Sequence, residues 1–183
     1  DALILKTQSL VNIFAQEKIK ESREAGSRPK SDQTEDPARK ERNRAKYSIL
    51  KQASESLEAY LKLRPEKSEQ GLWGEQLDAL RAYAKLGAEF ETGPAYQHPK
   101  ILYREKAGYT DAARNAWIQG TVILMAVLAD DGVIKHIMVL QPLSHGLTEQ
   151  AVMAARKIRF TPAAKDGKPI SIIVTLEYTF NPY

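Results

Sequence analysis

"GTVILMAVLADDGVIKHIMVL", residues 120–140, decides the fold of this chain because it holds two apolar, β-rich runs around Asp130-Asp131-Gly132. Asp and Gly tolerate the positive φ angles of tight turns, so the stretch predicts a β-hairpin. The same turn chemistry accounts for the two adjacent carboxylates without a catalytic role.

The chain after this hairpin predicts a helix and a further strand, in "GLTEQAVMAARKIRFTPAAKDGKPISIIV", residues 146–174. Small apolar residues form a narrow stripe over 151–158, suited to close packing on a sheet. Thr148 or Ser144 is expected to cap the helix, with Gly146 supplying the bend. Pro162 stops the helix, and "KDGK" at 165–168 is a second turn signal.

The last strand, residues 170–180, alternates between apolar and polar side chains. This period of two places one face against a core and the other in water. A short helix at about 110–116 precedes the hairpin, so the order is helix, strand, strand, helix, strand. The C-terminal half is therefore predicted to be an α+β domain with a small antiparallel sheet.

The first half has a helical period instead. Apolar residues recur at three- and four-residue steps before Ile19, and two further helices are expected at 43–63 and 68–88. The polar stretch 22–38 is expected to be a flexible connection. "ETGPAYQHPK", residues 91–100, separates the halves, which predicts a helical hairpin or three-helix module at 1–92 and an α+β domain at 93–183.

The composition of the chain excludes several classes of function. The 183 residues are 43% hydrophobic and 27% charged with a net charge of +4, and they contain no cysteine, which excludes disulfides and thiolate chemistry. The basic run 38–46 is interpreted as a solvated helix entry, so no nucleic-acid partner is expected. No apolar run reaches the length of a membrane span, and the chain, which starts with Asp1, is interpreted as a mature or truncated form whose anchor would be missing.

No residue set indicates an enzyme, a cofactor or a metal. His136 and His145 lack a third ligand at a metal-binding spacing. Ser144 and His145 are adjacent in a loop, where one side chain is not expected to be directed onto the other. Trp73 and Trp117 are interpreted as core or domain-contact anchors.

Fifteen positions of the second half form a pattern in a fixed order: Tyr109, Ala113, Arg114, Gly120, Val122, Asp131, Gly132, Gly146, Leu147, Ala151, Ala154, Phe160, Pro162, Gly167 and Pro169. Through these positions, residues 99–183 resemble the C-terminal domain of the TonB energy-transducer family. One departure is Tyr109-Thr110, where the family usually has Tyr-Pro.

The resemblance implies a non-enzymatic periplasmic protein that binds an extended segment of an outer-membrane receptor, the Ton box, by β-strand addition. Elementary physics agrees, because an open sheet leaves a row of unpaired backbone groups at its edge. The strand expected to bind the partner contributes Ser171, Ile173, Thr175, Glu177 and Thr179.

A periplasmic scaffold is the alternative. The words "LxxYLxLxP" from Leu57 and "WxxQLxxL" from Trp73 loosely resemble a tetratricopeptide hairpin, and the chain lacks the family's long proline-rich spacer. In this alternative the helices bind protein partners, and the TonB-like domain is structural or self-associating, for example as a homodimer.

Overall fold

The computed structural model describes residues 2–25, 37–64, 71–90 and 97–182, which fall into two compact units, Asp1–Pro94 and Ala95–Tyr183. The central part of the predicted flexible connection, residues 26–36, lies outside the described residues, whereas 22–25 and 37–38 are helical. Among the described helices, none combines the length and the apolar character that a membrane span requires.

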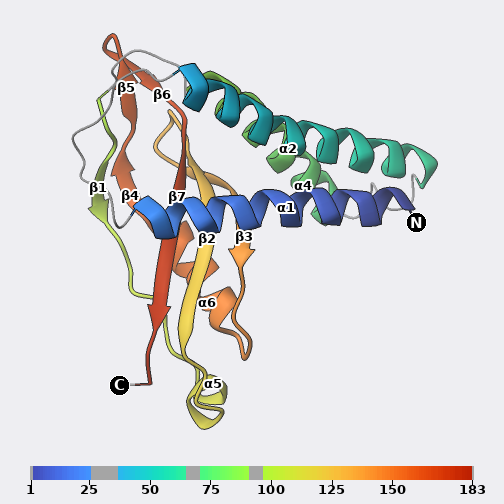
Figure 1. Ribbon diagram of the computed structural model, residues 1–183. Helices are drawn as coiled ribbons and strands as arrows, with labels where there is room; N and C mark the ends of the chain where they lie inside the picture. Colours follow the sequence, from blue (N-terminus) through green and yellow to red (C-terminus); the bar gives the residue numbers. More distant parts are fainter. Residues whose placement is uncertain (1, 26–36, 65–70, 91–96, 183) are drawn as a thin grey trace. The chain divides into compact units, whose positions relative to one another are not determined.

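The first unit consists of three helices, α1 (Ala2–Ala25), α2 (Pro37–Leu63) and α4 (Gly71–Phe90), shown from blue to green in Figure 1. Helix α2 packs against both α1 and α4. The predicted helical module is therefore confirmed, although α2 begins at Pro37, a residue suited to the first helical position. Its core contains the buried side chains Phe14, Tyr47, Leu50, Leu57, Leu80 and Tyr83.

One end of the basic run 38–46 is not solvated, contrary to the prediction. The Lys46 side chain is 6% exposed, and its Nζ lies 2.6 and 2.9 Å from the two carboxylate oxygens of Glu21 on α1. Burial alone would raise the pKa of Glu21, but the hydrogen bond and charge of Lys46, together with Lys18, outweigh it and hold the pKa below its usual value. This ion pair joins α1 to α2.

The second unit contains a three-stranded antiparallel sheet in the order β3-β2-β7. Its strands are β2 (Gly120–Leu128), β3 (Ile134–Gln141) and β7 (Ile172–Phe180), and its helices are α5 (Asp111–Asn115) and α6 (Leu147–Arg156). Helix α6 contacts all three strands (Figure 1). Its small residues Ala151, Ala154 and Ala155 are buried. The predicted α+β fold, including the Asp130–Gly132 hairpin, is thus confirmed.

Two two-stranded β-ribbons that the periodicity did not predict accompany the sheet. Strand β1 (Lys100–Tyr103) pairs antiparallel with β4 (Arg159–Thr161), and β5 (Ala163–Lys165) pairs with β6 (Lys168–Ile170). The β5–β6 turn uses Asp166 and Gly167 at φ 52° and 76°, as its turn signal indicates. The last strand begins at Ile172 rather than at residue 170, because Ile170 belongs to β6.

The predicted cap of α6 is wrong. Gly146 is the N-cap residue, at φ 79° and without a side-chain hydrogen bond. The Thr148 hydroxyl instead accepts from the Leu143 N–H at 2.8 Å and donates to the Leu143 carbonyl at 2.7 Å. Thr148 therefore closes the loop before the helix, while a left-handed glycine turns the chain into it.

Candidate functional site

The candidate site is the outer edge of β7. Strand β7 pairs with β2 in an unbroken register from Phe180 opposite Gly120 to Ile172 opposite Leu128. The sheet order places β7 at an edge, and in the part of the chain that the structure describes no strand pairs with its other side. A long, regular row of backbone groups is available there for another strand.

Hydrogen bonds show which residues direct their backbone groups outward. The Glu177 carbonyl accepts from the Arg104 guanidinium rather than from β2. Thr121 on β2 lies opposite Thr179. Its carbonyl accepts from Nε2 of Gln141 on β3 at 2.7 Å and therefore points away from β7. Since the N–H and C=O of one residue point the same way and alternate along an antiparallel strand, four residues present both groups to the outer edge: Ile173, Thr175, Glu177 and Thr179.

The opposite edge of the sheet, formed by β3, is irregular. Its pairing with β2 shifts register twice, between Ile123 and Leu124 and between Met125 and Val127, and His136 adopts φ 53°. Such bulges break the even spacing of backbone groups and twist an edge away from a partner strand. Of the two edges, β7 is therefore the one with the geometry for strand addition.

Arg104 lies directly on the candidate edge. Besides its hydrogen bond to the Glu177 carbonyl, its guanidinium carbon is 4.8 Å from the centre of the Tyr178 ring. Burial raises the pKa of Tyr178, and the nearby Arg104 charge opposes that rise. A strand added along β7 would meet this side chain at Glu177.

The structure brings most of the predicted partner-binding residues together. Thr175, Glu177 and Thr179 are exposed and Ile173 is half-buried on β7. Ser171 lies outside the strand, where its hydroxyl accepts from the Asp130 N–H at 3.0 Å and donates to the Asp130 carboxylate at 3.2 Å. Ser171 thus closes the end of the sheet. Arg104 was missed, because a lone exposed arginine in a loop carries no sequence signal.

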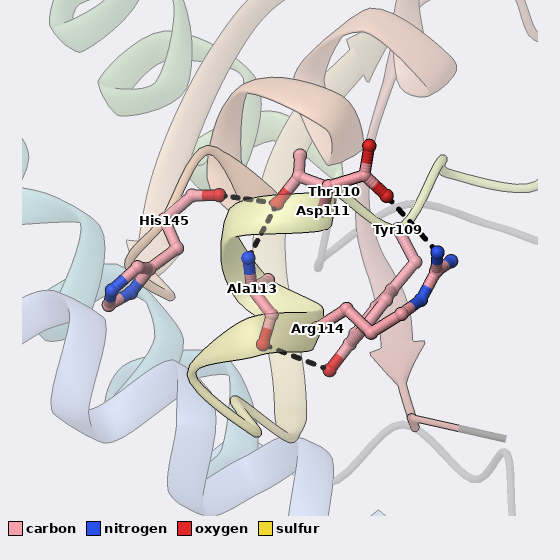
Figure 2. A network of polar contacts seen from close by, with 6 residues as sticks. All are labelled: Tyr109, Thr110, Asp111, Ala113, Arg114 and His145. Carbon is pink, nitrogen blue, oxygen red and sulfur yellow. Dashed lines mark hydrogen bonds and ion pairs between the residues drawn. The ribbon is translucent and has the colours of Figure 1, made fainter.

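A polar network fastens α5 to the loop before α6 (Figure 2). Thr110 caps α5 by accepting from the Ala113 N–H at 3.1 Å, and it donates to the His145 carbonyl at 2.6 Å. The Tyr109 hydroxyl donates to the Ile118 carbonyl at 2.5 Å, and its ring lies 6.3 Å from that of Phe180 at the end of β7. The network therefore supports the C-terminal end of the candidate edge.

Thr110 also accounts for the departure from Tyr-Pro. Its φ of −75° and ψ of 151° are backbone angles that proline adopts. Threonine keeps that backbone and adds a hydroxyl cap.

The other motif positions have structural roles in the second unit. Gly120 adopts φ 147°, and a Cβ there would lie 3.1 Å from the Leu143 side chain. Gly132, Gly146 and Gly167 also have positive φ. Leu147 and Phe160 are buried, Pro162 follows β4, and Arg114 forms an ion pair with Asp111 at 3.1 Å, which Figure 2 shows.

The other candidates from the sequence do not build a site. Ser144 Oγ lies 2.8 Å from His145 Nδ1, contrary to the expectation for adjacent residues, but both side chains are exposed. Among the described residues no group of three acidic or histidine side chains is placed to hold a metal ion. Trp73 is half-buried beside Tyr60, whereas Trp117 is 67% exposed and is not a core residue.

Comparison with known proteins bears on the second unit. The sequence model of the family described as Gram-negative bacterial TonB protein C-terminal matches residues 105–182. A solution NMR structure of the Pseudomonas aeruginosa TonB C-terminal domain is 26% identical and covers 45% of this chain and 85% of its own, with a TM-score of 0.40. The search among curated proteins finds no match.

The family match does not extend to the helical unit. Its three helices are present, but nothing in the comparisons supports the resemblance to a tetratricopeptide repeat. The family match coincides with the sheet, α5 and α6, and its residues include the whole of β7. Residues 105–182 of this chain are a TonB C-terminal domain.

Proposed function

We propose that this chain serves TonB-type energy transduction in the periplasm, and that β7 binds an extended segment of an outer-membrane receptor by strand addition. The observation that carries the proposal is the regular outer edge of β7 within a TonB C-terminal domain. Four alternate residues direct their N–H and C=O groups to that edge, so an added strand finds evenly spaced partners.

The side chains of the edge give the proposal its specificity. Thr175, Glu177 and Thr179 project from the exposed face of β7, where they would flank alternate side chains of the added strand. Each backbone hydrogen bond gained contributes about 0.5–1.5 kcal/mol net, so a few such bonds account for weak but specific binding. The Arg104 guanidinium has to leave the Glu177 carbonyl as the strand enters.

The test is a titration of the full chain with peptides from receptor N-termini, followed by amide chemical shifts. We expect the largest shifts at Ile173, Thr175, Glu177 and Thr179. Thr175→Pro removes an outward N–H but no bond to β2, so it should abolish binding while the fold is retained. Thr175→Val, which keeps the N–H, is the matched control and should bind.

Two outcomes would contradict the proposal. One is a silent β7 with no peptide binding at submillimolar concentration, and the other is equal binding by the proline and valine variants. Shifts confined to β3 would place the partner at the other edge of the sheet.

A scaffold function is the second candidate, and one observation favours it. The side of α1 formed by Leu5, Gln8, Asn12 and Ile13 is a shallow hollow, in which the apolar Leu5 is 64% and Ile13 47% exposed. Leu5→Glu with Ile13→Glu should abolish capture of a protein partner if the helices bind it. If partner capture survives in this double variant and fails in Thr175→Pro, the scaffold function is wrong.

A further inference from the structure

The positive charge of the chain is concentrated in the paired strands β1–β4 and β5–β6 and the residues beside them. We call residues 97–106 and 156–170 the basic ribbon; it holds eight Lys or Arg and two acidic residues, a charge of +6. Because the net charge of the chain is +4, all the other residues together carry −2. The eight cations are Lys100, Arg104, Lys106, Arg156, Lys157, Arg159, Lys165 and Lys168.

Strand pairing brings the two stretches together although about fifty residues separate them in the chain. Lys100 lies opposite Thr161, Tyr103 lies opposite Arg159, and Gln97 bridges to Ala164. Cross-strand partners share a face, so Lys100, Tyr103 and Arg159 approach one another on the side away from the buried Phe160.

Little acidic charge offsets these cations. Glu105 pairs with Lys157 at 2.9 Å, and Arg104 binds a backbone carbonyl. No ion pair within the described residues engages Lys100 or Arg159. Lys165 and Lys168 face each other directly across the β5–β6 turn, an arrangement that costs free energy unless an anion approaches.

The ribbon also exposes apolar side chains. Leu102 and Tyr103, at the end of β1, are 61% and 51% exposed, and they lie between Lys100 and Arg104 in the sequence. Aliphatic and aromatic side chains between cations suit the boundary between phospholipid headgroups and acyl chains.

We propose that the basic ribbon docks the domain on an anionic phospholipid membrane. The cations of both stretches bind headgroup phosphates, and Leu102 and Tyr103 enter the interface between them. A domain with +6 on this ribbon and a net negative charge on its other residues turns the ribbon toward a negative surface. The proposal does not depend on strand addition at β7.

A second copy of the chain fits the same edge less well. Antiparallel pairing of β1 with its copy about Leu102 would set Lys100 opposite Arg104 of the other copy. Like charges directly opposite destabilise a strand pair. The charge therefore favours an anionic surface over self-association.

The experiment is cosedimentation of the full chain with vesicles in 0.1 M NaCl. We expect binding to vesicles of phosphatidylglycerol and phosphatidylcholine mixed at about 3:7, and none to phosphatidylcholine alone, with binding lost at high salt. Lys100→Gln with Arg159→Gln should weaken binding roughly 30-fold, because each cation near an anionic surface contributes about fivefold. Leu102→Ser should weaken it several-fold without changing its salt dependence.

The matched control removes the same charge elsewhere. Lys62→Gln with Lys135→Gln changes two exposed lysines outside the ribbon and should leave vesicle binding within about twofold. The proposal is overturned if this control loses as much binding as the ribbon variant, or if neutral vesicles bind equally. It is also overturned if inorganic phosphate blocks binding far more than chloride at equal ionic strength, since the ribbon would then be a small-anion site.

Discussion

Gly87 on α4 is the position where one added methyl group has the largest expected effect on the helical unit. A Cβ at Gly87 would lie 2.1, 2.2 and 2.2 Å from three carbons of the Tyr47 ring on α2, whereas ordinary contacts lie at 3.4–4 Å. The ring cannot simply retreat, because Phe14 lies 5.5 Å from its centre and the ammonium groups of Lys18 and Lys46 lie 5.2 and 5.3 Å from it. Gly87→Ala therefore overpacks the contact between α2 and α4.

The magnitude follows from a matched pair of glycines on the same helix. Gly74 has nothing within 4 Å of an added Cβ, so Gly74→Ala should raise the free energy of unfolding by about 0.5–1 kcal/mol through helix propensity. Gly87→Ala gains the same propensity but incurs an overpacking cost of about 3 kcal/mol, the upper end for such changes. We expect a net loss of about 2 kcal/mol.

Urea unfolding followed by ellipticity at 222 nm measures this difference. That signal reports mainly on the first unit, whose helices contain 24, 27 and 20 residues against 5 and 10 in the second. Tyr47→Leu should reduce the cost of Gly87→Ala, because it removes the ring that the methyl group meets. The reasoning is refuted if Gly87→Ala is as stable as Gly74→Ala, or if Tyr47→Leu leaves its cost unchanged.

Changes at three further positions test other contacts. Thr110→Ala should destabilise the second unit by about 1 kcal/mol through loss of the α5 cap, and Thr110→Pro should cost no more, because the backbone angles suit proline; thermal unfolding followed by near-ultraviolet ellipticity measures both. The pKa of Glu21 is lowered by folding, so its contribution to stability is present above its usual value of 4.5 and is lost as pH falls through the folded-state pKa. Glu21→Gln should therefore flatten the decline in stability below that pH, and an unchanged slope in urea titrations would contradict the role of the ion pair. Gly120→Ala should cost about 1–3 kcal/mol in chemical unfolding, because its φ of 147° and the Leu143 side chain at 3.1 Å both oppose a Cβ; an unchanged unfolding midpoint would exclude this.

Much of the fold could be predicted because hydrophobic period and turn chemistry act locally. The runs on either side of Asp130–Gly132 became β2 and β3, and Ala151 and Ala155 of the predicted stripe lie on the buried face of α6, whereas Ile158 follows the end of that helix. The cap of α6 was mispredicted because several residues near a helix start can each supply a hydroxyl. Only the completed loop shows that Thr148 bonds Leu143 instead.

The candidate site was predictable in part for the same reason. Alternation along the last strand identified the exposed Thr175, Glu177 and Thr179. It did not show that β3 carries two register shifts while β7 has none, because a bulge is a property of a strand pair. Nor did it show that Arg104, more than seventy residues away, binds the Glu177 carbonyl.

By itself the sequence determined the helical and the α+β halves, the order of the main elements, and the resemblance that the family match to residues 105–182 confirmed. Those properties follow from short-range patterns, and each can be identified within a window of a few turns or strands. The tertiary structure alone decided which sheet edge is regular and where the positive charge gathers. In sequence, the basic residues of 97–106 and 156–170 appear as two modest groups; antiparallel pairing of β1 with β4 makes them one surface, because strand pairing joins residues irrespective of their separation along the chain.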